Sequence, residues 1–147
     1  MSHPDRNLSR IRFPLQGLLA VALVLAAPLV HGQQGCQFTG NPSGITFTAL
    51  DPSVATTRTA FTDVKIKCTP AGTTPTWSFS SANGGASPRM QNSVVPTEYI
   101  PYSIAASFQG NTGANQNWRL TATVLGQDYQ NAYAGPYSDI LTATITP

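Results

Sequence analysis

Charged residues are scarce in this chain, where Asp, Glu, Lys and Arg together make up only 10% of the 147 residues. Nucleic acids and anionic membranes are bound by clustered Lys and Arg, and the sequence has no such cluster. Lys65 and Lys67 flank Ile66 and fit the solvated face of a strand. We therefore expect neither a nucleic acid nor an anionic membrane surface as a partner.

The first 32 residues have the features of a signal peptide. Three arginines lie between residues 6 and 12, residues 15–30 are apolar, and Val30 and Gly32 stand at the two positions that signal peptidase reads. The alternative is an uncleaved anchor, but the apolar segment is shorter than the roughly 20 residues that span a bilayer. We expect cleavage before Gln33, export, a single domain over 33–147 and no membrane insertion after cleavage.

Beyond this cut the charges cancel, so the overall charge of +2 comes largely from the signal segment. The remaining cations are Arg58, Lys65, Lys67, Arg89 and Arg119, and the remaining anions are Asp51, Asp63, Glu98, Asp128 and Asp139.

Only two cysteines are present, Cys36 and Cys68, and an even count in an exported chain predicts a disulfide. A metal site is the alternative, but it needs more ligands than two sulfurs, and no histidine follows the predicted cut.

The same lack of histidine, with one glutamate and no spare cysteine, leaves no evident base or nucleophile for catalysis. We expect no metal, no cofactor and no enzymatic activity, and we expect Asp139 to cap the turn before the last strand.

Short runs of alternating apolar and polar residues follow residue 32, separated by turns rich in Gly, Pro and Asn, and no helical periodicity accompanies them. They span residues 45–49, 64–68, 76–80, 100–104, 118–124 and 141–145. This spacing predicts an all-β antiparallel sandwich. Because the last run is followed only by Thr146 and Pro147, we expect its edge to stay open or to be covered by a strand from elsewhere.

The apolar phase of these runs gives the expected core. Trp77 and Trp118 fall on it, so we expect both rings to be packed inside and not to form a ligand platform. The full inward set is Ile45, Phe47, Val64, Ile66, Trp77, Phe79, Ile100, Tyr102, Ile104, Leu120, Ala122, Val124, Leu141, Ala143 and Ile145.

A series of short motifs, in order along the chain, resembles the spore coat protein U domain, which also forms the subunits of archaic chaperone–usher pili. The motifs are Cys36, Gly-Ile-Thr-Phe at 44–47, Val-Lys-Ile-Lys-Cys-Thr at 64–69, Arg-Met at 89–90, Tyr-Ile-Pro-Tyr at 99–102, Gly-Pro-Tyr-Ser-Asp at 135–139 and Ile145. The resemblance covers essentially all of residues 33–147.

This resemblance implies an incomplete immunoglobulin-like sandwich that lacks its last strand. A periplasmic chaperone lends a strand to the open groove, an outer-membrane usher handles the subunit, and another pilin subunit then replaces the chaperone's strand. By position, the groove is expected to be lined by Ile45, Phe47, Leu141, Ala143 and Ile145. The implied destination is the cell surface or an extracellular fibre.

The family's shaft subunits carry an apolar extension before the first cysteine, and this chain departs from that pattern. Only Gln33, Gln34 and Gly35 separate the predicted cut from Cys36, and three residues reach about 10 Å at most. We expect a subunit that accepts a strand and does not donate one, which suits a fibre tip or a secreted coat component.

A stand-alone secreted module that binds carbohydrate or adheres to a surface is the alternative function. Tyrosines in the loop before the last strand are its best candidates, since exposed aromatic rings stack on sugars. We take Tyr129 and Tyr133 as the candidate adhesive surface.

Overall fold

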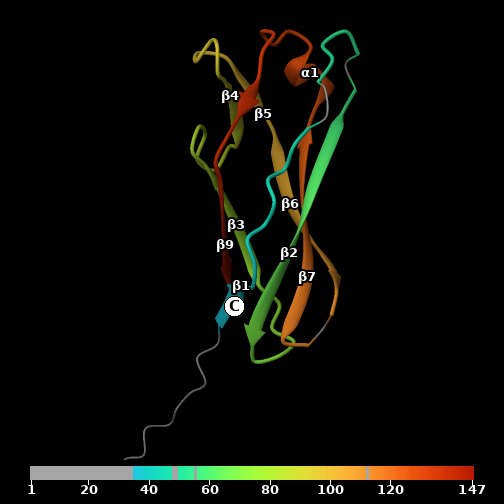
Figure 1. Ribbon diagram of the computed structural model, residues 1–147, viewed down its shortest axis with the longest axis vertical. Coiled ribbons are helices and arrows are strands. Elements are labelled where there is room, and N and C mark those ends of the chain that lie inside the picture. Colours follow the sequence, from blue (N-terminus) through green and yellow to red (C-terminus); the bar gives the residue numbers. More distant parts are fainter. Residues whose placement is uncertain (1–34, 48–49, 55, 112) are drawn as a thin grey trace, which may run out of the picture.

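The computed structural model describes residues 35–47, 50–54, 56–111 and 113–147 (Figure 1). The predicted signal peptide and its cut before Gln33 lie outside the described residues. The strands are β1 (Gly35–Phe38), β2 (Arg58–Thr69), β3 (Thr76–Ser81), β4 (Arg89–Asn92), β5 (Tyr99–Pro101), β6 (Ser103–Gly110), β7 (Asn115–Val124), β8 (Tyr137–Ser138) and β9 (Leu141–Thr146), with one helical turn, α1 (Gly126–Tyr129).

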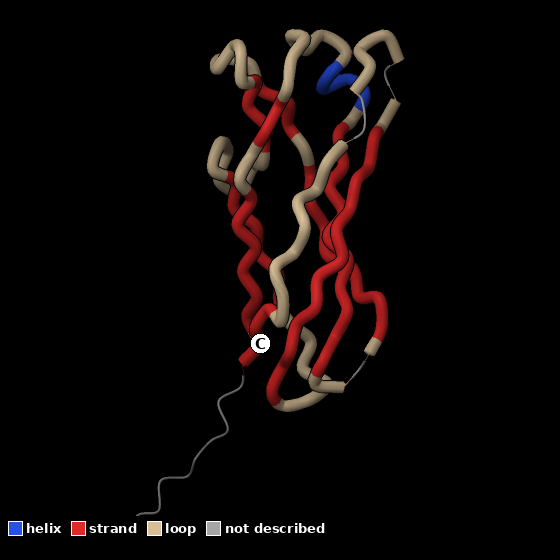
Figure 2. The backbone as a smooth tube through the Cα atoms, viewed as in Figure 1, coloured by secondary structure: helices blue, strands red, loops and turns tan. Residues whose placement is uncertain are grey.

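All strand pairs are antiparallel, and they form three sheets (Figures 1 and 2). The largest sheet has the order β1-β2-β7-β6, and it faces a layer made of the pair β3-β9 and the trio β5-β4-β8. The predicted all-β antiparallel fold is confirmed.

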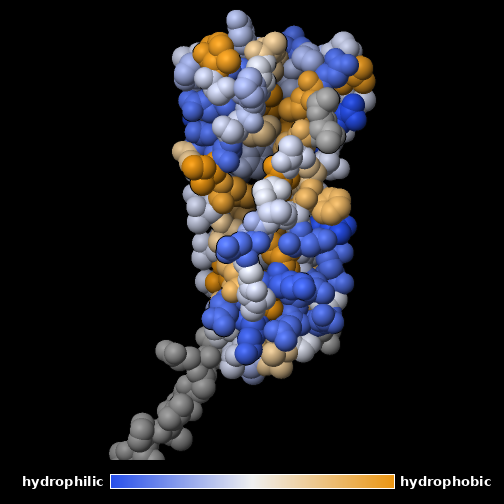
Figure 3. Space-filling view, viewed as in Figure 1, coloured by the Kyte–Doolittle hydropathy of each residue, from blue (hydrophilic) through white to orange (hydrophobic). Residues whose placement is uncertain are grey.

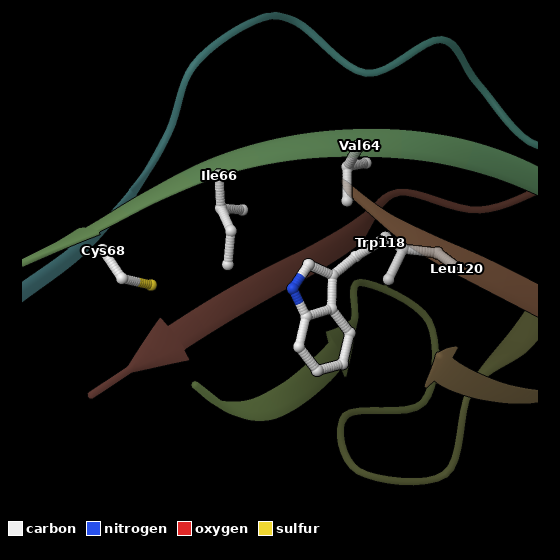
Figure 4. Packing of buried hydrophobic residues seen from close by; sticks show 5 residues of the cluster. All are labelled: Val64, Ile66, Cys68, Trp118 and Leu120. Carbon is white, nitrogen blue, oxygen red and sulfur yellow. The ribbon is translucent and has the colours of Figure 1, made fainter. Parts of the chain in front are cut away.

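The long pair β2–β7 forms the floor of the core. Its register runs from Arg58 opposite Val124 to Lys67 opposite Asn115, and every second side chain of β2 is buried. Figure 4 shows Val64 and Ile66 of β2 beside Trp118 and Leu120 of β7. Residues of β3, β6 and β9 pack against this cluster from the opposite layer or the sheet edge. The apolar side chains that alternate with polar ones in these strands therefore lie together in one core, as the sequence predicts.

A second buried cluster lies toward the other end of the molecule. Ile100, Val124 and Tyr129 form it, and partly buried residues including Phe47 and Tyr102 pack against it. Since Tyr102 separates β5 from β6, the predicted strand 100–104 is divided into two strands that belong to different sheets. One stretch of chain thus connects the two layers.

Four predicted runs lie within observed strands, namely 64–68 in β2, 76–80 in β3, 118–124 in β7 and 141–145 in β9. The predicted strand 45–49 is wrong over its described part, since residues 45–47 are not a strand. Gly40, Pro42 and Gly44 lie just before it. Proline has no N–H to donate and glycine weakens strand pairing, so this stretch cannot supply a regular ladder.

The disulfide between Cys36 and Cys68 is formed, as predicted. The two residues stand directly opposite one another in the β1–β2 register. The bridge therefore fastens the short β1 to the end of β2.

We expect replacement of both Cys36 and Cys68 by Ser to lower the free energy of unfolding by about 3–4 kcal/mol, since the bridge closes a long loop in the unfolded chain; the two residues are 32 apart in sequence. Denaturant unfolding of the parent and of the double variant measures the difference. Adding a reductant should destabilise only the parent, and equal stabilities without reductant would contradict the prediction.

Candidate functional site

The two layers fail to join along one side of the molecule. The strand β9 pairs with β3 on one edge only, and β2 pairs with β7 along most of its length but with β1 only over Ile66–Thr69. Along the rest of these two strands, no described strand covers the facing edges. Residues 40–47 lie between the two edges as an irregular loop that runs upward from β1 in the view of Figure 2.

This segment lies along β2 without forming a ladder. Thr39 N donates to Lys65 O at 2.9 Å, and the hydroxyl groups of Ser43 and Thr62 lie 2.9 Å apart. If the β1–β2 pairing continued along the chain, Ser43 would lie opposite Phe61 of β2. The observed contact of Ser43 is with Thr62, so the segment is shifted by one residue from that pairing. Among the described residues, 40–47 make no backbone–backbone hydrogen bond. The segment therefore follows the edge of β2 but leaves most of its backbone groups unpaired.

A groove of about 1120 Å³ lies between this segment and the edge formed by β8 and β9. Its floor includes Leu120 and Ala122 of β7 and Ile100 of β5, and Leu141 and Ala143 form part of one wall. Figure 3 shows apolar side chains reaching the surface between the two layers. The hollow therefore exposes the edge of the core to solvent.

Four of the five residues predicted to line a groove do so: Ile45, Phe47, Leu141 and Ala143. Ile145 does not line it, and packs instead against the core cluster near Trp77, its partner in the β3–β9 register. The strand β1 approaches β9 to within 8 Å between Cα atoms, beside the C-terminal end of β9 (Figure 1). The groove is closed at that end because the disulfide holds β1 there.

At its other end the groove extends further than the sequence indicated. Tyr137, Ser138 and Asp139 line it. The side chains of Tyr137 and Asp139 are partly buried and continue the inward phase of Leu141 and Ala143, whereas Ser138 and Ile140 are exposed. The two-residue strand β8 was too short to be predicted on its own. The feature of the sequence that could have predicted β8 is the alternating pattern of residues 141–145, which continues toward the N-terminus as far as Tyr137.

Asp139 connects three parts of the chain from within this groove. Tyr102 Oη donates to Asp139 Oδ2 at 2.7 Å, and Asn83 Nδ2 donates to Asp139 Oδ1 at 3.1 Å. The backbone N of Ile140 also donates to Oδ1, at 2.9 Å. The predicted capping role is therefore present but incomplete, since the carboxylate also holds β8–β9 to the loop after β3 and to the β5–β6 junction.

The candidate adhesive surface is wrong for Tyr129. The side chain is only 1% exposed, and its hydroxyl donates to the carbonyl oxygens of Thr56 and Val54 at 2.6 and 3.0 Å. The turn α1 directs the ring into the second core cluster, and a four-residue helix is too short to give a periodic signal. Tyr133 is 56% exposed and stays available at the surface.

The two tryptophans are packed inside, as expected. Trp118 is buried and its Nε1 donates to Gln116 Oε1 at 2.9 Å. Trp77 is partly buried and packs against the core cluster, with its ring 5.5 Å from that of Trp118 between centroids. Neither ring forms part of an open stacking platform.

Comparison of the chain with protein-family models finds no match, and comparison with curated proteins finds none either. Within residues 35–147, apart from the undescribed positions, no helix is long and apolar enough to cross a membrane. The same part of the chain contains no group of three or more His, Cys, Asp or Glu side chains placed to hold a metal ion.

We expect Tyr102→Phe to lower the free energy of unfolding at pH 7 by about 1–2 kcal/mol, because it removes a hydrogen bond to a carboxylate. Burial raises the pKa of Tyr102 above its ordinary value of 10.0, and the bond to Asp139 raises it further. The raised pKa means that the unfolded chain ionises first, so this contribution is complete below pH 10 and declines as the pH rises above it.

The difference in stability between the parent and Tyr102→Phe should therefore shrink above about pH 10. Denaturant unfolding at several alkaline pH values measures it. A difference that stays constant across this range would show that the hydroxyl of Tyr102 is not held in its neutral form by the fold.

Proposed function

We propose that this chain is an exported structural subunit whose groove accepts a β-strand from a partner protein. The observation that carries the proposal is the unpaired edge of β9 beside an apolar groove that reaches the core. Unpaired strand edges readily bind another strand, and apolar pockets for alternate side chains fix its register. The resemblance to the spore coat protein U domain supports the same assignment, with an immunoglobulin-like sandwich that lacks one strand.

The edge along the groove is long enough for one extended segment. Residues 137–143 offer an edge of about 23 Å at roughly 3.3 Å per residue. Neighbouring strands lie about 4.8 Å apart, so a strand inserted between two others needs roughly 9.6 Å. Since β1 comes within 8 Å of β9, the accepted strand ends where β1 begins to cover β9. The partner strand therefore lies along β8 and the first half of β9.

The gain from such a strand is of the size that stable assembly needs. Each apolar side chain buried in the groove contributes about 1.5–3 kcal/mol, and each backbone hydrogen bond adds roughly 0.5–1.5 kcal/mol. Three inward side chains with a few ladder bonds therefore offset the loss of freedom on binding. The same ladder could be offered first by a periplasmic chaperone and then by another subunit delivered through an outer-membrane usher.

The subunit donates no strand in this proposal. That part depends on the predicted cut before Gln33, which leaves three residues ahead of Cys36 and no apolar side chain among them. A subunit of this kind ends a fibre or coats a surface and does not extend a chain of its own. Sequencing the N-terminus of the exported protein tests this part separately.

We expect Ala143→Trp to weaken strand acceptance strongly, because Ala143 is the small residue in the groove wall and an indole there fills the space that the strand requires. Binding of a synthetic peptide of about nine residues, in which Ile, Val and Leu alternate with Thr and Ser, should weaken by about 100-fold, or roughly 3 kcal/mol. Fluorescence anisotropy of the labelled peptide measures the affinity.

Thr144→Trp is the matched control, since Thr144 is the next residue of β9 and is exposed on the opposite face. It should bind the peptide as the parent does. Thermal unfolding of both variants shows whether each is folded. Equal peptide affinities of the parent and of folded Ala143→Trp would contradict the proposal that the groove accepts a strand.

A further inference from the structure

The edge that would accept a strand carries one charge on its inward phase. Along residues 137–143 the inward side chains are Tyr137, Asp139, Leu141 and Ala143. Asp139 is thus a carboxylate that stands between apolar neighbours in the wall of the groove. An inward residue of an accepted strand must lie close to it.

No cation balances this carboxylate among the described residues. The one ion pair they form joins Arg119 to Asp63, on the outward phase of the β2–β7 pair. Arg89 is part of the surrounding network, but its Nε donates to the carbonyl oxygen of Asn83 and its guanidinium lies over the ring of Tyr99. It makes no ion pair with Asp139.

The donors that do reach Asp139 are neutral. They are the Tyr102 hydroxyl, the side-chain amide and the backbone N–H of Asn83, and the backbone N–H of Ile140. A carboxylate has about four acceptor sites, and Oδ2 accepts only the bond from Tyr102. One site on Oδ2 is therefore free for a further donor, and no described cation forms an ion pair with the carboxylate.

A strand that fills the groove excludes water from this carboxylate. Burying a charge without an opposite charge is strongly unfavourable. The burial of this charge would therefore lower the affinity of the groove for a purely apolar strand. A lysine or arginine offers the missing charge, and its aliphatic stem can lie over the apolar groove.

We propose that Asp139 selects a partner strand with a lysine or arginine at the inward position that faces it, between apolar inward residues. This inference rests on the proposed function, since it specifies the strand that the groove accepts. It makes Asp139 a specificity-determining residue of the interface. The partner is thus an extended segment of alternating pattern with one internal basic residue on its apolar face.

The test is a lysine scan of a labelled synthetic peptide of alternating Ile, Val and Leu with Thr and Ser. One lysine replaces each residue in turn, and norleucine at the same position provides an uncharged chain of similar length. With the exported protein, one inward position should bind about tenfold more tightly with lysine than with norleucine, which corresponds to roughly 1.4 kcal/mol. Lysine at outward positions, in peptides of the same net charge, should give no gain.

The variant Asp139→Asn keeps the shape of the side chain, with its oxygen able to accept from Asn83 and Ile140 and its amide nitrogen able to donate to the Tyr102 hydroxyl. In this variant the lysine gain should disappear while the norleucine peptide binds at least as well as it binds to the parent. If Asp139→Asn does not fold, the inference is tested on the parent protein alone, with peptides in which one glutamate replaces each residue in turn. Glutamate at the selective position should then weaken binding by about tenfold or more.

Two results would overturn the inference while leaving strand acceptance intact. One is binding of the norleucine peptides with no gain from lysine at any inward position, and the other is a lysine gain of equal size in Asp139→Asn. Failure of every peptide to bind a folded protein would instead overturn the proposed function, and this inference with it.

Discussion

The backbone edge of β9 that no described strand covers is the constraint on which the rest of this structure depends. In a sandwich, each strand needs a partner on both sides unless it lies at a protected edge. Here the segment that could serve, residues 40–47, contains Pro42 between two glycines and makes no backbone–backbone hydrogen bond among the described residues. The core beneath it is consequently left open. The groove is thus a product of the local chemistry of this segment, while the core around it is regularly packed.

The disulfide decides where along this edge the opening lies. By joining Cys36 to Cys68, it keeps β1 on the end of β2 and within 8 Å of β9. The part of β9 beside β1 has no room for an additional strand, and Ile145 is packed into the core there. Beyond β1 the chain turns irregular, and the groove begins. The bridge therefore both stabilises the fold and limits the length of the strand that the proposed function places in the groove.

Much of this arrangement could be predicted from alternation alone, because four of the strands bury one face and expose the other. The same rule failed at residues 45–47, which alternate in sequence but make no backbone–backbone hydrogen bond among the described residues. The expectation of an exposed loop tyrosine failed at Tyr129, where the direction of the ring is set by a single helical turn and by hydrogen bonds to residues more than 70 positions away. Alternation identifies which residues prefer the core. It does not show whether a backbone partner exists, and the groove is defined by that missing partner.

Scarcity of charge gives Asp139 its importance in this groove. In a chain with five acidic residues after the predicted cut, placing one on the inward face of an open edge acts against occupation by any apolar segment. Inward-pointing charges are one means by which proteins protect strand edges from unwanted pairing. The bonds from Tyr102 and Asn83 hold this carboxylate in position, so it cannot simply turn away to solvent. A charge fixed in this way disfavours apolar strands and favours a basic one, and the groove can therefore be open and selective at the same time.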